Sequence, residues 1–375
     1  MQNKRLLRMM IGSITAVCML LSFAACNDGT VPDEGSNPPS GEDETPTHTH
    51  SYTWETTLEP TCTAKGSKTG KCACGDVQQE EISALGHDVV NYECTRCDYR
   101  ESQGLEFALN LDGDSYAVTG IGSCEDLDVV IPSLYEGKPV TSIGINAFLS
   151  CDSLTSIGIP YSVTKIEESA FEACKSLTAV FITDIVAWCH IEFENGYSNP
   201  LTYARDLYLN ESLVETLVIP DNTIRIGDYA FYGCVSLVNI TIPDSITKIG
   251  EWAFAGCIKM TSMVIPGSVT QIGNYAFYWC TSLTSVSIGN GVVLIDEGAF
   301  SYCNRLTSIN IPGSVTKIGS GTFMESNDLT EITYEGTYEE WNNISKADAF
   351  QGQIIEWNYS CNIQTVHCLD GDIMV

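Results

Sequence analysis

An elongated α/β solenoid built from 23-residue repeats is the fold class that the sequence predicts. Four consecutive segments of this length, between Leu237 and Asp328, place apolar residues at matching positions. A row of phenylalanines recurs at one position of the repeat: Phe148, Phe171, Phe231, Phe254, Phe277, Phe300 and Phe323. Neighbours in this row are 23 residues apart, except for a single step of 60. A fixed period of this kind is typical of stacked coils that share one core.

Each repeat combines the periodicity of a strand with that of a short helix. Ile240 and Ile242 alternate with polar residues, as along a β-strand, and Pro243 ends that strand. Apolar residues between Ile249 and Cys257 then follow the spacing of one helical face. A strand and a helical turn in every repeat predict a leucine-rich-repeat horseshoe, whose single coils need stacked neighbours to bury their apolar side chains.

The repeat also resembles a known family. The segment MTSMVIPGSVTQIGNYAFYWC, from Met260 to Cys280, follows the pattern LxxIxIPxSVTxIGxxAFxxC. This pattern looks like that of the BspA-like leucine-rich-repeat surface proteins of bacteria, and the resemblance extends from about Leu105 to the C-terminus. It implies a surface-exposed binding protein, which in some members is an adhesin for host matrix proteins or for other cells.

The first 47 residues predict export and a tether. Residues 1–25 combine a basic start, an apolar run and small residues before Cys26, which indicates a secretion signal. The sequence before Cys26 resembles a bacterial lipoprotein box, so lipid anchoring through Cys26 is expected, with ordinary cleavage as the alternative. Residues 26–47 contain no aromatic residue and one valine, so we expect a disordered acidic spacer that lifts the following domains off a membrane.

Residues 48–103 predict a small module rich in cysteine and histidine. Cys72 and Cys74 form one pair, and Cys94 and Cys97 form another pair further along the chain. Thiolates from two such pairs can close a tetrahedral site for structural zinc in a domain with little core. Disulfides and free thiols are the alternatives, because an exported protein meets oxidising conditions. Further candidate ligands are Cys62, His50 and His87.

The rest of the chain divides by its repeat pattern. We expect an N-terminal cap with the first repeat at 104–153, regular repeats at 154–328 with an insertion at about 184–212, and a C-terminal cap at 329–375. Caps are needed because the first and last coils would otherwise expose their core and strand edges. Cys361 and Cys368 in the C-terminal cap are candidates for a disulfide.

The insertion accounts for the 60-residue step in the phenylalanine row. It contains Trp188, Tyr197 and Tyr203, and the sequence around Asn210 indicates a hairpin that leaves the solenoid. Loops that project from repeats often bind partners. Recognition and packing are both open roles for these three aromatic residues.

The outward strand positions form the second candidate binding surface. On the expected concave sheet these positions are mostly hydroxyl-bearing or amide-bearing: Thr216, Asn239, Thr241, Ser262, Ser285, Ser287, Ser308 and Asn310. They predict a flat face for weak, multivalent contact with a protein or a glycan. The alternative is that threonine and serine simply suit solvated strands.

Composition and motifs exclude several functions. The formal net charge of −30 repels phosphate backbones, so a nucleic-acid partner is not expected. The chain has none of the common nucleophile, metalloprotease, phosphate-loop or dinucleotide motifs, so we expect no enzyme and no catalytic cofactor. Most of the repeat phenylalanines are followed three residues later by a cysteine. This regular place predicts that these cysteines point inward and are structural, and that they are not reactive thiols.

These observations together predict a cell-surface, lipid-anchored binding protein that engages a protein or glycan ligand, for example one derived from a host. The alternatives are a structural or self-associating envelope component, and a glycan-capture lipoprotein.

Overall fold

The computed structural model describes residues 50–87, 89–90, 92–346 and 363–374. Its described residues fall into two compact units, which divide between Leu85 and Gly86. The predicted secretion signal, Cys26 and the spacer lie outside the described residues.

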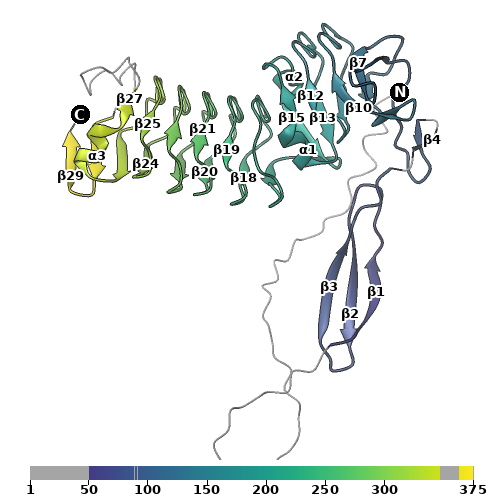
Figure 1. Ribbon diagram of the computed structural model, residues 1–375, viewed down its shortest axis with the longest axis horizontal. Coiled ribbons are helices and arrows are strands. Elements are labelled where there is room, and N and C mark those ends of the chain that lie inside the picture. Colours follow the sequence, from purple (N-terminus) through teal and green to yellow (C-terminus); the bar gives the residue numbers. More distant parts are fainter. Residues whose placement is uncertain (1–49, 88, 91, 347–362, 375) are drawn as a thin grey trace, which may run out of the picture. The chain divides into compact units, whose positions relative to one another are not determined.

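The first unit is a three-stranded antiparallel sheet (Figure 1). Its strands are β1 (Tyr52–Leu58), β2 (Gly66–Cys72) and β3 (Val77–Ile82), in that order across the sheet. None of the hydrophobic side chains described in this unit is buried; Lys68 instead lies 4.6 Å from the centre of the Trp54 ring and pairs with Glu80 at 2.7 Å. A sheet of this size without a hydrophobic core needs another source of stability.

The second unit begins with two hairpins. The strands β4 (Val89–Val90) and β5 (Glu93–Cys94) form the first hairpin, and β6 (Glu106–Leu109) and β7 (Tyr116–Gly120) form the second. β7 also pairs in parallel with β10 (Lys138–Ile143), which is flanked by the short β9 (Leu134–Tyr135). The hairpin β6–β7 therefore covers the first edge of this sheet.

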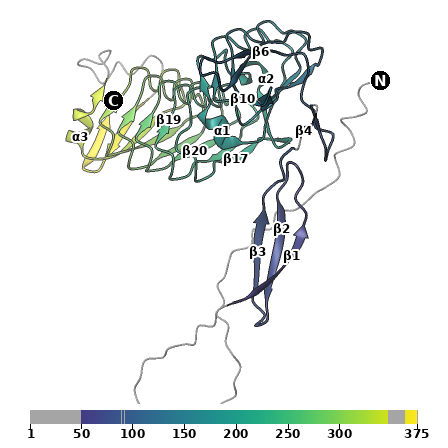
Figure 2. The same ribbon diagram turned by 45° about the vertical axis from the view of Figure 1, so that its right-hand side comes forward.

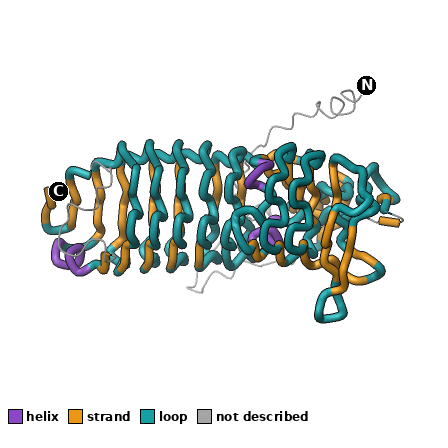
Figure 3. The backbone as a smooth tube through the Cα atoms, turned by 90° about the horizontal axis from the view of Figure 1, so that it is seen from above, coloured by secondary structure: helices purple, strands orange, loops and turns teal. Residues whose placement is uncertain are grey.

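Stacked coils form the rest of the second unit, and most of them contribute one long and one short strand (Figures 2 and 3). The long strands are β8 (Asp128–Val130), β11 (Ser156–Ile159), β13 (Ala179–Ile182), β15 (Asp206–Leu209), β17 (Thr216–Val218), β18 (Asn239–Thr241), β20 (Ser262–Ile265), β22 (Ser285–Ile288), β24 (Ser308–Pro312), β26 (Glu331–Glu335) and β28 (Thr365–Cys368). The short strands beyond β10 are β12 (Lys165–Ile166), β14 (Glu192–Phe193), β19 (Lys248–Ile249), β21 (Gln271–Ile272), β23 (Leu294–Ile295), β25 (Lys317–Ile318) and β27 (Ser345–Lys346).

The parallel register confirms the predicted leucine-rich-repeat solenoid. Ser262 pairs with Ser285, Ser285 with Ser308, and Ser308 with Glu331, so successive coils are offset by 23 residues. Inward residues of these strands, such as Met263, Val286 and Ile309, belong to one continuous core.

The helix expected between Ile249 and Cys257 is absent, and this part of the prediction was wrong. Trp252 and Gly256, which flank Phe254, both have left-handed backbone angles, with φ of 56° and 75°. A left-handed residue interrupts the i to i−4 hydrogen bonds of a helix. The backbone N–H of Phe254 instead donates to Ala276 O of the next coil at 2.8 Å. Each coil therefore turns through two tight turns that are bonded to the neighbouring coil.

The repeat phenylalanines and cysteines fill the core as the sequence indicates. The ring of Phe254 stacks between those of Phe231 and Phe277, with centroid distances of 5.3 and 5.4 Å. The thiol of Cys257 donates to Phe231 O at 3.3 Å. In the last repeat the hydroxyl of Ser326 replaces the thiol and donates to Phe300 O at 2.8 Å.

The insertion is built into the solenoid as one enlarged coil and a hairpin. Ala179 pairs with Asp206, so this coil is 27 residues long, and it contains the helices α1 (Ile185–His190) and α2 (Leu201–Ala204). The strand β15 then pairs with the antiparallel β16 (Ser212–Leu213), which is the hairpin expected around Asn210. The hydrogen-bonded ladder of long strands stops at this hairpin and resumes at β17.

The C-terminal end is covered by a helix and a final hairpin. The helix α3 (Tyr338–Asn343) begins with a capping box between Thr337 and Glu340. Its Trp341 is buried against Tyr334, with a ring centroid distance of 5.2 Å. The strand β29 (Gly371–Met374) pairs with β28 at the sheet edge. Cys361 of the candidate disulfide lies outside the described residues.

Candidate functional site

The long strands present the predicted polar face. Thr216, Asn239, Thr241, Ser262, Ser285, Ser287 and Ser308 are all exposed, and Asn310 is half-buried. In parallel register such residues form rows with neighbours about 4.8 Å apart. Asn310 donates to Glu335 Oε1 at 2.7 Å and is thus partly committed to an internal contact. The face also carries Val218 and Val264, whose side chains are about two-thirds exposed.

Sequence reasoning missed a second surface, on the turns beside the repeat phenylalanines. We call it the aromatic turn surface and define it by seven residues: Tyr229, Tyr232, Trp252, Tyr275, Tyr278, Trp279 and Tyr302. Trp252 stacks on Tyr275 of the next coil, with a centroid distance of 4.4 Å and an interplanar angle of 20°. Trp252 also makes edge-to-face contacts with the rings of Tyr232 and Tyr278. Tyr278 in turn makes an edge-to-face contact with Tyr302.

Carboxylates accompany these rings. Trp252 Nε1 donates to Glu251 Oε1 at 3.1 Å, and the hydroxyl of Tyr275 donates to Glu297 Oε1 at 2.6 Å. The hydrogen bond to Glu297, followed by burial, raises the pKa of Tyr275 to about 12. The signal in the sequence was the repeated Tyr or Trp two residues before the phenylalanine, and one or two residues after it, in consecutive repeats.

The three aromatic residues of the insertion have different roles. Trp188 is 1% exposed and donates from Nε1 to Ala230 O at 2.8 Å, so it packs in the core and cannot contact a ligand. Tyr203 is half-buried against the same core. Tyr197 is 49% exposed, and the pKa of Tyr232 is raised by burial and then by its electrostatic interaction with Tyr197. Tyr197 therefore lies beside the aromatic turn surface.

A group of two cysteines and one histidine lies in the first unit. Ligand atoms of His50, Cys72 and Cys74 all lie within 4.8 Å of one another, and Cys74 Sγ is 3.3 Å from His50 Nδ1. The backbone N–H of Cys74, followed by its thiol and by His50, lowers the pKa of Cys72 to about 6. Asp76 Oδ2 is 3.9 Å from His50 Nδ1 and accepts a hydrogen bond from Tyr52.

A similar group lies at the start of the second unit. Ligand atoms of His87, Cys94 and Cys97 also lie within 4.8 Å of one another, and Cys97 Sγ is 3.3 Å from His87 Nδ1. The backbone N–H of Arg96 donates to Cys94 Sγ at 3.5 Å. Each predicted cysteine pair is thus joined by a histidine of its own unit, which the sequence analysis named only as a further candidate.

Thiolate and imidazole are the ligands that zinc prefers in structural sites, so both groups fit this metal. The thiols lie at hairpin turns, at the end of β2 and in β5, where a bound ion would join chain segments.

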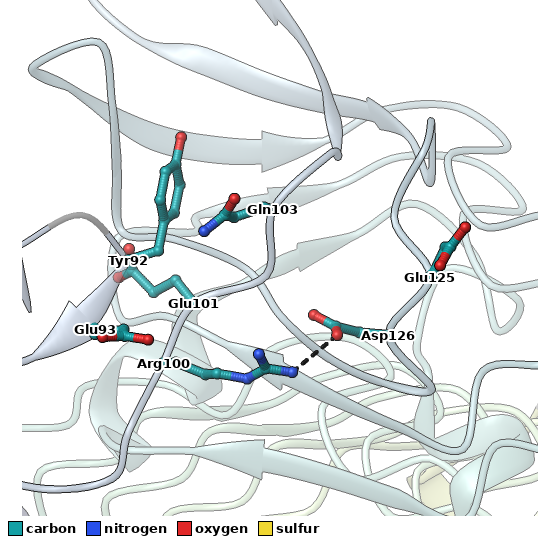
Figure 4. A pocket seen from close by; sticks show the side chains of 7 residues that line it. All are labelled: Tyr92, Glu93, Arg100, Glu101, Gln103, Glu125 and Asp126. Carbon is teal, nitrogen blue, oxygen red and sulfur yellow. Dashed lines mark hydrogen bonds and ion pairs between the residues drawn. The ribbon is translucent and has the colours of Figure 1, made fainter.

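An acidic pocket of about 250 Å³ opens at the start of the second unit (Figure 4). Glu93, Glu101, Glu125 and Asp126 contribute four carboxylates to its lining. Arg100 donates to Asp126 at 3.0 Å, and Ser102 donates to the same carboxylate at 2.7 Å. Burial raises the pKa of Glu101. The lining side chains include no cysteine, serine or histidine, so this pocket offers no nucleophile and base pair.

Among the residues described, none of the helices has both the length and the apolar character of a membrane span.

Three solved structures illustrate what the chain is similar to. A leucine-rich-repeat protein of T. pallidum shares 28% identity over 60% of this chain and 88% of its own, with a TM-score of 0.36. A leucine-rich cell surface protein of Faecalibacterium prausnitzii shares 22% identity over 66% of this chain and 98% of its own, with a TM-score of 0.30. The pneumococcal vaccine antigen PcpA shares 14% identity over 85% of this chain and 99% of its own, with a TM-score of 0.38.

No curated protein matches the chain. The family model for the BspA type leucine-rich repeat region matches six copies, in residues 128–195 and 204–351, which is more than half of the chain. The period, the parallel register and this match agree, and the chain belongs to the BspA-type leucine-rich-repeat family.

Proposed function

We propose that this chain is a cell-surface binding protein of a bacterial envelope, which engages a protein or glycan partner without catalysing a reaction. The register of the solenoid carries the proposal. It repeats equivalent exposed side chains from coil to coil, with Ser262, Ser285 and Ser308 side by side. Repeated weak contacts gain avidity when a partner also repeats.

The long-strand face is the proposed site of these repeated contacts. The proposed contact residues are the outward polar residues of these strands: Thr216, Asn239, Thr241, Ser262, Ser285, Ser287, Ser308 and Asn310. Small hydroxyl and amide groups donate and accept hydrogen bonds, which suits both polypeptide backbone and sugar hydroxyls. Tyr197 of the insertion is a further proposed contact because of its exposed ring.

Location at the cell surface rests on the N-terminal sequence and on the family. Residues 1–25 have the composition of a secretion signal, and Cys26 stands where a lipoprotein would be modified. We include lipid anchoring through Cys26, and the spacer at 26–47, in the proposal. A lipid anchor and a spacer of this composition would present the repeats away from the membrane.

Structural zinc in residues 48–103 is part of the same proposal. No hydrophobic side chain described in the first unit is buried, and His50, Cys72 and Cys74 gather at one end of its sheet. Metal binding contributes folding free energy where a core is missing. The hydrogen bond from Tyr52 to Asp76 resembles the outer contacts that orient metal ligands.

The test is binding by the full chain displayed at high density on beads. Intact bacteria, host matrix proteins and glycan arrays serve as targets. We expect saturable binding to at least one target, weakened when Asn239, Ser262 and Ser285 are changed together to alanine. The matched control changes Thr247, Thr270 and Thr316 to alanine, because these exposed threonines precede the short strands. No binding to any target, together with ordered self-assembly in light scattering, would favour the structural envelope component instead.

A further inference from the structure

We propose that the aromatic turn surface captures a lysine-rich or arginine-rich segment of a polypeptide partner. This inference rests on the proposed function, since it names the chemistry of one partner and a second face of the repeats that holds it. Three observations carry it: ring packing, backbone strain and local charge.

Six of the seven rings form a chain of contacts over consecutive coils. Trp252 lies at its centre and contacts Tyr232, Tyr275 and Tyr278 at centroid distances between 4.4 and 6.1 Å. Trp279 is 56% exposed, which is unusual for the largest side chain. Tyrosine and tryptophan at such sites offer large contact areas that lose little side-chain entropy on binding.

The backbone beneath these rings is strained. Trp252, Tyr275 and Trp279 have φ between 54° and 59°, in the left-handed region that side chains other than glycine seldom adopt. Glycine or a smaller side chain occupies the equivalent positions in several other coils, as at Gly256, Gly298 and Ala173. Bulky residues kept in such a conformation point to a role beyond the turn itself.

The charge of the turn segments indicates which kind of partner the aromatic turn surface would bind. The four segments 228–234, 251–257, 274–280 and 297–303 hold three carboxylates, on Asp228, Glu251 and Glu297, and no lysine, arginine or histidine. Lys259 and Arg305 stand two residues beyond the cysteine of their coils, outside these segments. An anionic partner would be repelled, whereas an ammonium or guanidinium group can rest on a ring face and pair with a carboxylate.

The first unit of the chain already contains such a contact. Lys68 Nζ lies 4.6 Å from the centre of the Trp54 ring and 2.7 Å from a carboxylate oxygen of Glu80. Trp252 beside Glu251 offers a similar combination of ring and carboxylate to a cation from outside the chain.

The test uses the full chain and a fluorescent peptide of alternating lysine and glycine. Trp279→Gly keeps the net charge and relaxes the left-handed backbone. We expect it to weaken peptide binding about 2–5-fold, without lowering the denaturation midpoint. Ala173→Gly is the matched control, because Ala173 is left-handed at the same repeat position, with φ of 61°, but has no ring.

Trp279→Phe separates a ring contact from a structural effect. It keeps an aromatic face and should retain most of the peptide affinity. Equal affinity of the wild type, Trp279→Gly and Trp279→Phe would overturn the inference, whatever their stabilities. The displayed full chain offers a second test, in which Trp279→Gly is compared with the wild type for binding to a cell or matrix target. Unchanged binding would overturn this inference as well, but it would leave the proposed function standing.

The carboxylates need a control for net charge. Glu251→Gln with Glu297→Gln should weaken peptide binding more than Glu215→Gln with Glu331→Gln, whose exposed carboxylates lie at the long strands. Equal losses from the two double variants would mean that net charge alone attracts the peptide, and the inference would be wrong.

Discussion

One phenylalanine and one cysteine or serine per coil form the buried interior beside the turns. The phenylalanine rings stack nearly parallel, with interplanar angles of 3° and 8° around Phe254. The thiols of Cys174, Cys257, Cys280 and Cys303 each donate to a backbone carbonyl of the preceding coil. These residues therefore hold neighbouring coils together, and their contributions can be measured one at a time.

Phe254→Ala tests the ring stack. Phe254 is fully buried between two other rings, so its removal leaves a cavity and should lower the free energy of unfolding by about 3–5 kcal/mol. Thr241→Ala, on the exposed face of β18, should change it by less than about 0.5 kcal/mol. Urea unfolding followed by circular dichroism compares the two variants. Equal effects would contradict the role given to the stack.

Alkylation tests the inward cysteines. Burial raises the pKa of Cys174 and of Cys280 to about 12, so both thiols are protonated at pH 8 and shielded from solvent. We expect iodoacetamide to modify neither residue at pH 8 until the protein unfolds. Cys72, whose pKa is lowered to about 6, is the reactive reference in chelator-treated protein. Rapid labelling of Cys280 in folded protein, read by mass spectrometry, would refute this.

Sequence reasoning located these buried residues but not the backbone between them. Apolar residues between Ile249 and Cys257 fit a helix, and the left-handed positions gave no warning because asparagine, serine, alanine, tyrosine and tryptophan occupy many of them. Contacts between coils determine the turn, and these are not visible in the spacing of one repeat. The aromatic turn surface was overlooked for the same reason.

At the scale of elements, the two groups of cysteine and histidine residues are candidate metal sites that can be tested. The spacing of Cys72, Cys74, Cys94 and Cys97 predicted one site of four cysteines, because pairs of thiols are the usual ligands of structural zinc. The structure adds a histidine to each pair, and His50 comes from the chain before β1, far from Cys72 in sequence. Spacing alone could not choose between these ligand sets.

Elemental analysis of the reduced full chain tests the metal. We expect two zinc ions per chain, because each unit offers its own ligands. Cys72→Ser with Cys74→Ser should lose one ion, Cys94→Ser with Cys97→Ser the other, and Cys124→Ser neither. Loss of all zinc in either double variant would support the four-cysteine site instead. An absence of zinc from the wild type would remove the metal from the account.

The insertion shows a second limit of sequence reasoning. The 60-residue step predicted its position, and the residues around Asn210 predicted a hairpin that leaves the solenoid. A hairpin of β15 and β16 is present there, but β15 pairs with β13 within the solenoid. The burial of Trp188 was not predicted, since an aromatic residue in an insertion can face either way. Its indole N–H bonds a carbonyl 42 residues further along the chain, which no local pattern reveals.

For the whole molecule, the repeat period and the net charge were the informative quantities. The period alone was enough to predict the solenoid, because only stacked neighbours can bury the apolar side of a coil. The charge of −30 predicts that the chain does not bind nucleic acid and, with the aromatic turn surface, favours a cationic partner. The partner itself is set by loops and surfaces, whose side chains the repeat leaves free to vary.

Salt tests the electrostatic part of this account. If carboxylates such as Glu251 and Glu297 attract a cationic segment, association of the lysine-rich peptide should slow as ionic strength rises, because the Debye length shortens from about 30 Å at 0.01 M to about 8 Å at 0.15 M. Stopped-flow anisotropy measures the association rate. A rate that does not depend on salt would argue against charge steering.

The central claim is that the repeats face the outside of the cell. Protease treatment of intact native bacteria tests it most directly, with wild type compared with Cys26→Ala. The account predicts that the wild-type repeats are cleaved while a cytoplasmic marker survives, and that the Cys26→Ala protein appears in the medium. Repeats that stay protected until the envelope is broken would contradict the claim and place the protein inside.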